Sequence, residues 1–148
     1  MLKNLLNISA VPRNSDAALL VLRVGSLVPL LLRHGLEKVF TFSAMAANFP
    51  DPLHIGVLPS LVFAMLSDAV CSTFIVLGLA TRWSALIAFI NIFVAWAFVH
   101  HFVLLDRSTE HGELIAVYLA VLITLFLAGP GKYSLDYLIG NPIFAKTA

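Results

Sequence analysis

Apolar residues fill four long stretches of the chain, and polar residues gather between them. The stretches cover residues 17–40, 55–80, 83–105 and 113–128. About 20 helical residues at 1.5 Å rise cross a hydrocarbon core of about 30 Å, so the first three stretches are long enough to span a membrane. The fourth is shorter and requires little tilt or a locally thinned bilayer. The pattern predicts an all-α transmembrane four-helix bundle.

The segments outside these stretches complete the predicted organisation. Residues 42–59 contain three prolines among aromatic side chains, so we expect an interfacial segment between the first two helices instead of a fifth span. Residues 1–16 lack the pattern of a signal peptide and are expected at the cytoplasmic membrane surface, with Ser15 or Asp16 capping the first helix. The predicted domains are therefore this N-terminal segment, a transmembrane domain at 17–136 and a C-terminal tail at 137–148.

Composition agrees with a chain that has the lipid bilayer as its main partner. Hydrophobic residues make up 60% and charged residues 11% of the sequence, and the mean hydropathy is +0.96. A net charge of +1 without a basic cluster predicts no nucleic-acid partner. The lone Cys71 cannot form an internal disulfide, so any redox chemistry would belong to a bound cofactor or a partner protein.

The distribution of basic residues predicts the orientation. Four spans put both termini on one side of the membrane, and that side receives more lysine and arginine than the other. The positive-inside rule therefore predicts cytoplasmic termini. The residues compared are Lys3, Arg13, Arg82, Lys132 and Lys146 on the first side, and Arg33, Lys38 and Arg107 on the second.

Two charged residues lie inside the predicted spans. Asp68 is near the centre of the second stretch and Arg23 lies in the first. A charge at the bilayer centre costs about 2.5 to 3.5 kcal/mol, so each charge requires a partner or a function. Antiparallel packing of the two helices predicts an intramembrane ion pair between Arg23 and Asp68, which acts either as a structural clamp or in proton movement.

The histidines gather at the predicted outer end of the bundle. They form a candidate site with neighbouring polar and aromatic residues, although polar residues also collect at helix ends simply to reach water. If the cluster is functional, it is a site for a cation, a proton or a cofactor. Haem ligation is a weaker hypothesis, because two histidines would have to face each other at one depth. No metal site is predicted. The candidate residues are His34, Lys38, His100, His101 and Glu113, with Phe40, Phe93, Trp96 and Phe98 as aromatic walls.

Helical periodicity predicts which side chains of the third span face inward. A stripe at 3.6-residue spacing runs through Ser84, Ala88, Asn91, Ala95 and Phe98. The residue after Val99 then lies about 180° from the asparagine of that stripe and the next residue about 80° away, at about 100° per residue. The two adjacent histidines therefore cannot both face the core, and the sequence leaves open which one does.

Several motifs occur in an order that resembles the DoxX family of small bacterial membrane proteins. The resemblance covers roughly residues 17–136. It rests on Arg23, on His34-Gly35 with Lys38, on the acid of the second span followed by Leu77-Gly78-Leu79-Ala80-Thr81-Arg82, on the third-span histidines, and on Gly129-Pro130-Gly131-Lys132-Tyr133-Ser134-Leu135-Asp136. Asp68 stands where a glutamate is common in that family, and Cys71-Ser72 where small residues are frequent.

The resemblance implies a four-helix bundle in the bacterial inner membrane and a link to respiratory redox chemistry. A related DoxD-like protein is a subunit of a thiosulfate:quinone oxidoreductase. The leading hypothesis is therefore a quinone-associated redox or accessory subunit, in which His34, Lys38 and a third-span histidine donate to the quinone and Glu113 passes protons. The alternative is a non-enzymatic carrier of a small solute or protons, or an assembly factor. A redox partner protein and a homodimer are compatible with either reading.

Overall fold

Every regular element in the described part of the chain is a helix. The computed structural model describes residues 14–104 and 111–144, and it contains no strand within these ranges. Three helical spans are long and apolar enough to cross a membrane, Ser15–Phe40, Val57–Leu77 and Thr81–Val99, and a shorter apolar helix covers Gly112–Ala128. The chain is thus a multi-pass membrane protein, and the predicted all-α fold class is confirmed.

The elements keep close to the predicted boundaries. In chain order they are α2 (Ser15–Leu30), η1 (Leu31–Gly35), α3 (Leu36–Phe40), α4 (Phe42–Met45), α5 (Val57–Met65), η2 (Leu66–Cys71), α6 (Ser72–Leu77), α7 (Thr81–Val94), η3 (Ala95–Val99), α8 (His111–Ala128) and α9 (Leu135–Phe144). Between α3 and α5 only the short α4 and turns occur, as expected for the interfacial segment. Residues 137–148, which were predicted as a C-terminal tail, include most of helix α9, a helix that the sequence pattern did not predict.

Each of the three long spans contains one π-helical segment, which lies inside the first two spans and ends the third. In η1 the backbone N–H of Leu36 donates to the carbonyl of Leu31, and after η3 the N–H of His100 donates to the carbonyl of Ala95 at 3.0 Å. Pro29, which has no N–H to donate, lies inside α2 just before the first of these segments. A π segment changes which side chains face inward, and such segments occur frequently at functional sites.

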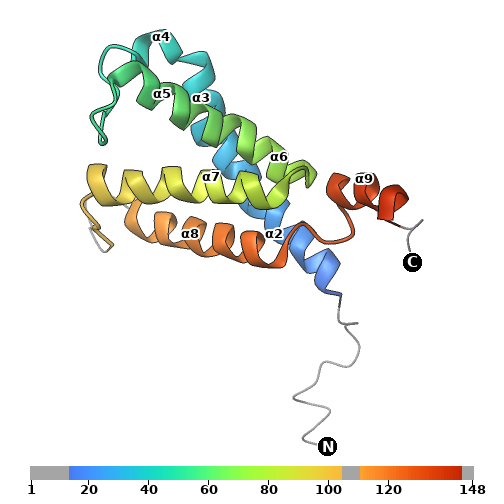
Figure 1. The fold of residues 1–148 in the computed structure, drawn as a ribbon. Coiled ribbons are helices and arrows are strands. Elements are labelled where there is room, and N and C mark those ends of the chain that lie inside the picture. The colour runs from blue at the N-terminus through green and yellow to red at the C-terminus, as the bar shows by residue number, and fades with distance from the viewer. Residues whose placement is uncertain (1–13, 105–110, 145–148) are drawn as a thin grey trace, which may run out of the picture.

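The helices pack closely at one end and diverge at the other. Figure 1 shows α7 and α8 side by side with α2 crossing behind them, while α6 meets α7 at the packed end and α5 diverges from α7 toward the end that carries α4. Ala85 and Ala88 of α7 are fully buried, and such small residues let neighbouring helices approach closely. Leu27, Ile75 and Leu122 complete a core that keeps the packed end closed.

Side chains tie together the loops at the packed end of the bundle. The carboxylate of Asp136 accepts hydrogen bonds from the N–H groups of Ala80 (2.7 Å) and Thr81 (3.0 Å), and its own N–H donates to the carbonyl of Gly78 at 2.8 Å. Asp16 accepts a hydrogen bond from the N–H of Lys132 at 3.0 Å. We call these contacts the clasp. They hold the start of α2 and the end of α8 on the same side of the bundle.

Arg23 belongs to this clasp and does not pair with Asp68. Its guanidinium is fully buried and donates to the carbonyls of Tyr133 (2.6 Å) and Ile75 (3.4 Å). Ile75 lies seven residues beyond Asp68, or about 10 Å along the helix. The predicted Arg23–Asp68 ion pair is therefore wrong, because the arginine side chain extends away from Asp68, to one carbonyl near the end of α6 and one in the loop before α9.

Two local details also concern the packed end. Gly78 ends α6 with a φ of 72°, and a Cβ atom there would collide with the Arg23 side chain, so the position suits only glycine.

The first helix is capped by the side chain of Asn14, which accepts a hydrogen bond from the N–H of Ala17 at 3.0 Å. The prediction of Ser15 or Asp16 as the cap is wrong, since Ser15 is already helical and Asp16 serves the clasp.

Candidate functional site

A cavity of about 440 Å³ lies at the end of the bundle where the helices diverge. Its wall is mostly apolar and includes side chains from every long helix and from the loop before α5. The lining residues are Leu30, His34, Lys38, Phe49, Pro50, Pro52, Leu53, Ile55, Ser60, Phe63, Ala64, Asp68, Ile90, Asn91, Ile92, Val94, Ala95, Val99, His100, Leu114, Ile115 and Tyr118. The volume falls in the range of sites for small organic ligands.

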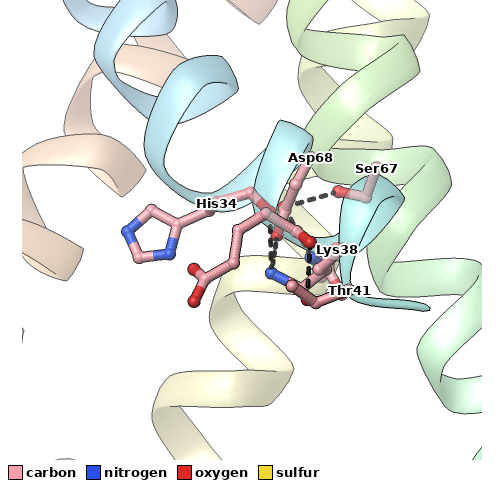
Figure 2. Close-up of polar contacts among 7 residues, drawn as sticks. His34, Lys38, Thr41, Ser67 and Asp68 are labelled. Carbon is pink, nitrogen blue, oxygen red and sulfur yellow. Dashed lines mark hydrogen bonds and ion pairs between the residues drawn. The ribbon is translucent and has the colours of Figure 1, made fainter. Parts of the chain in front are cut away.

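The polar part of the wall centres on Asp68. Its carboxylate accepts a hydrogen bond from the Lys38 ammonium at 2.7 Å, from the Asn91 amide at 3.0 Å and from the Ser67 hydroxyl at 3.5 Å. Figure 2 shows Lys38 and Ser67 approaching this carboxylate from different helices. The side chains of Lys38 and Asp68 are only 13% and 8% exposed. The buried aspartate that the sequence singled out is thus neutralised by lysine, and three helices meet at it.

The ammonium of Lys38 retains capacity for a ligand. It has three N–H donors, of which one serves Asp68 and a second serves the backbone carbonyl of His34 at 3.3 Å. The third donor has no acceptor among the described residues. Because Lys38 also lines the cavity, this donor is available to an oxygen atom placed there.

His34 lines the cavity but stands apart from the ion pair. Figure 2 shows its imidazole directed away from Lys38 and Asp68, and the ring makes no hydrogen bond within the described residues. Gly35, the next residue, brings η1 against η2, because a Cβ atom there would lie 2.5 Å from the carbonyl oxygen of Asp68. The two π segments that carry His34 and Asp68 therefore pack in close contact.

Two further residues of the wall were not recognised as site residues in the sequence. Tyr118 of α8 is 8% exposed, and its hydroxyl makes no hydrogen bond within the described residues. Asn91 holds Asp68 with its amide nitrogen, which leaves its carbonyl oxygen without a partner there. A buried tyrosine usually finds a partner for its hydroxyl, whereas the Tyr118 hydroxyl beside the cavity is left able to bond to an atom placed there. A tyrosine within an otherwise apolar span was the available signal.

The structure separates the other predicted site residues. His100 lines the cavity, whereas His101 is exposed, so His100 is the inward-facing histidine. Glu113 is exposed at the start of α8 and does not line the cavity. Trp96 lies outside the lining and donates to the carbonyl of Val103 at 3.3 Å, because η3 turns its indole toward the chain that follows the helix.

The aromatic part of the wall also differs from the prediction. Phe40, Phe93 and Phe98 lie outside the lining, and each is at least 40% exposed. Phe49 of the loop and Phe63 of α5 supply the rings of the cavity instead. These phenylalanines lie on the outer surface of the bundle, which is the ordinary place for an apolar side chain in a membrane protein.

The loop that precedes α5 covers one end of the cavity. The carboxylate of Asp51 accepts hydrogen bonds from the Ser60 hydroxyl (2.8 Å) and from the N–H groups of Gly56 (2.8 Å) and Ile55 (3.1 Å). These bonds, above all the one from Ser60, hold the pKa of Asp51 below its ordinary value. Asp51 thus fastens the loop to the start of α5, and we call its three hydrogen bonds the latch.

Metal binding has no obvious place in the described residues. No group of three or more histidine, cysteine, aspartate or glutamate side chains is arranged there to hold a metal ion. His111 lies where side chains are not described, and Arg107 and Glu110 fall in residues 105–110, outside the described range.

Comparison with known proteins places the chain in a family. A model of the DoxX family matches residues 18–101, a range that contains His34, Lys38, Asp68 and Asn91 but not Tyr118. An uncharacterized protein of Haemophilus influenzae is 32% identical over 131 residues, which cover 84% of this chain and 85% of that protein. No solved structure is significantly similar to the chain. The match over more than half of the sequence and the helical membrane fold agree with the motifs, and the chain belongs to the DoxX family.

Proposed function

We propose that this protein is a quinone-associated accessory subunit of a membrane oxidoreductase system and that it holds the quinone head group in the cavity. The observation that carries the proposal is a largely apolar cavity with a few unsatisfied polar groups on its wall. Such a combination is typical of sites for amphipathic cofactors. Family membership agrees with the proposal but cannot carry it, because one fold serves many functions.

The residues of the wall fit the chemistry of a quinone. A quinone ring is apolar and carries two carbonyl oxygens that accept hydrogen bonds. The third N–H of Lys38 and the hydroxyl of Tyr118 are donors without acceptors among the described residues, and Phe49 and Phe63 offer aromatic surface. His34 can donate or accept a hydrogen bond, depending on its tautomer.

Each residue has a distinct part in the proposed site. Asp68 holds the ammonium of Lys38 in place, and Asn91 holds Asp68, so the donor is oriented before a ligand arrives. The carbonyl oxygen of Asn91 can accept a hydrogen bond from a reduced, hydroxyl-bearing head group. The bound quinone would supply the redox chemistry. Its electrons would come from a partner protein, since the single Cys71 cannot cycle as a disulfide.

The proposal includes a location and an orientation. A bacterial inner membrane with both termini in the cytoplasm agrees with the distribution of basic residues, and the clasp keeps the start of α2 and the end of α8 on one side. The cavity would then lie toward the outer face. A reporter fused after Ala148 should behave as cytoplasmic, and one inserted near Asn48 as external. The reverse pattern would place the cavity toward the cytoplasm.

A proton carrier is the second candidate, and the Lys38–Asp68 pair favours it. Ionisable side chains inside membrane spans frequently mark proton or ion pathways. In that case, the protein in sealed liposomes should dissipate an imposed pH gradient, and Asp68→Asn should abolish the flux. Quinone binding predicts no such flux.

A fluorescence titration tests quinone binding directly. Trp83→Phe leaves Trp96, which follows the lining residue Ala95, as the one remaining tryptophan, and a bound quinone should quench it saturably. Tyr118→Phe removes one hydrogen bond, worth about 1 kcal/mol, so the affinity should fall about fivefold. Tyr137→Phe, at an exposed position of α9, is the matched control and should leave the affinity unchanged. Quenching that rises linearly without saturation would contradict the proposal.

A further inference from the structure

The wall of the cavity contains apolar residues that are also exposed on the outside of the bundle. Among the exposed apolar lining residues, Leu53 and Ile55 belong to the loop before α5 and Leu114 to the start of α8. Phe63 of α5, which is 41% exposed, and Ile90 of α7, which is 46% exposed, lie instead within the long membrane spans. A residue that belongs to a cavity wall and to the outer surface lies at an opening. These two residues come from the two helices that border the same gap, so we call the opening between them the lateral mouth.

The arrangement of the helices explains why the mouth exists. α7 packs against η2, the segment that carries Asp68, and this contact closes the bundle below the cavity. Figure 1 shows α5 diverging from α7 beyond that contact, toward the end with α4. The opening therefore lies along the side of the bundle, between α5 and the second half of α7.

The mouth lies at membrane depth. Ile90 is the midpoint of the span Thr81–Val99, nine residues from each end, and Phe63 is six residues, or about 9 Å, into the span Val57–Leu77. Both side chains are apolar. The opening is thus surrounded by the hydrocarbon core of the bilayer, from which water-soluble molecules are excluded.

We propose that the lateral mouth admits the apolar tail of a membrane-dissolved amphiphile, whose carbonyl-bearing head occupies the cavity near Lys38, Asp68 and Tyr118. This inference rests on the proposed quinone site and adds the route of the tail and the residues that select for it. The tail leaves between Phe63 and Ile90 into lipid, so the ligand does not have to be fully enclosed. A cavity of about 440 Å³ then needs to hold only the head and the first part of the tail.

Photolabelling can locate the tail. The probe is a benzoquinone with a ten-carbon alkyl tail that carries a diazirine on the carbons nearest the ring, and the protein is the full chain in lipid nanodiscs. After irradiation, mass spectrometry of peptides reports which residues are labelled. Labelling that disappears in the presence of excess quinone without the diazirine is specific. We expect specific labelling on the peptides that contain Phe63 and Ile90.

A pair of isoleucine variants provides the matched control. Ile90→Phe enlarges a side chain at the mouth and narrows the opening, so the specific labelling yield should fall by about tenfold. Ile87→Phe makes the same change on the same helix at a residue that is 38% exposed but does not line the cavity, so its labelling should equal that of the wild type. Thermal unfolding of both variants verifies that each is folded.

The outcomes separate this inference from the proposed function. Specific labelling confined to the loop at residues 49–55 would mean that the tail leaves through the loop, which overturns the lateral mouth while the quinone site stands. Equal labelling in the two phenylalanine variants would also overturn it. No specific labelling anywhere, together with no saturable quenching of Trp96, would overturn the proposed function and the inference with it.

Discussion

Replacing Lys38 by methionine should destabilise the protein strongly, because Asp68 would lose its counter-charge. The Nζ and Oδ2 atoms are 2.7 Å apart, and both side chains are largely buried. Two unit charges at that distance attract each other by about 6 kcal/mol at an effective dielectric constant of 20, before desolvation is subtracted. Breaking a buried pair from one side typically costs 3 to 5 kcal/mol. Asn91 and Ser67 would still donate to the carboxylate, so we expect about 3 kcal/mol for Lys38→Met, at the lower end of that range.

A double-mutant cycle isolates the interaction from other effects of the substitutions. Asp68→Asn keeps the shape of the side chain and removes its charge. If the pair is direct, the double variant should be more stable than the sum of the single losses predicts, with a coupling free energy of about 2 kcal/mol. The assay is equilibrium unfolding in detergent micelles, followed by circular dichroism.

A second cycle with Arg23→Met is the matched control. Arg23 reaches the carbonyls of Ile75 and Tyr133, about 10 Å from Asp68, so its loss should add to that of Asp68→Asn within about 0.5 kcal/mol. Strong coupling of Asp68 with Arg23, and none with Lys38, would refute the assignment of the ion pair.

Two other predictions test the contacts around the cavity. Gly35→Ala should destabilise the protein by about 1 to 3 kcal/mol, because its Cβ would meet the backbone of Asp68, whereas Gly25→Ala, which has nothing within 4 Å of its Cβ, should not destabilise it; equal thermal unfolding of the two variants would contradict the close contact of η1 and η2. Asp51 has a lowered folded-state pKa, so its latch is complete above the unfolded-state value of about 4 and is lost as the pH falls through the lower folded-state value. Limited proteolysis of the loop should therefore accelerate in acid for the wild type, while Asp51→Asn should be cleaved readily at all pH values tested.

The spans could be predicted from the sequence because hydrophobic runs of this length have few alternatives in a membrane protein. The long-range partners could not, and the third span shows why. Its predicted inward stripe holds for Ser84 and Ala88, which are buried, and for Asn91 and Ala95, which line the cavity, but fails at Phe98, which is 54% exposed. The failure begins where η3 begins, at Ala95, since a π segment departs from the 3.6-residue period.

The π segments also explain why His100 and His34 do not face where a regular α-helix would place them. The 3.6-residue period places His100 opposite Asn91, yet both line the cavity because η3 lies between them. His34 and Lys38 are four residues apart and would share a face of a regular α-helix, but Gly35 ends η1 between them, and the imidazole is directed away from the Lys38–Asp68 pair. The Lys38–Asp68 pair and the clasp contacts join residues far apart in the sequence, which no periodicity encodes.

The decisive measurement for the proposed quinone site is the amount of quinone that copurifies with the protein. Lipid is extracted from the wild type and from Tyr118→Phe, purified in the same mild detergent, and the quinone is quantified per protein chain and per phospholipid. If the cavity binds a quinone, the quinone to phospholipid ratio of the wild type should lie well above that of the source membrane, and it should decrease clearly for Tyr118→Phe. A ratio equal to that of the membrane in both proteins would contradict the claim that the cavity binds a quinone.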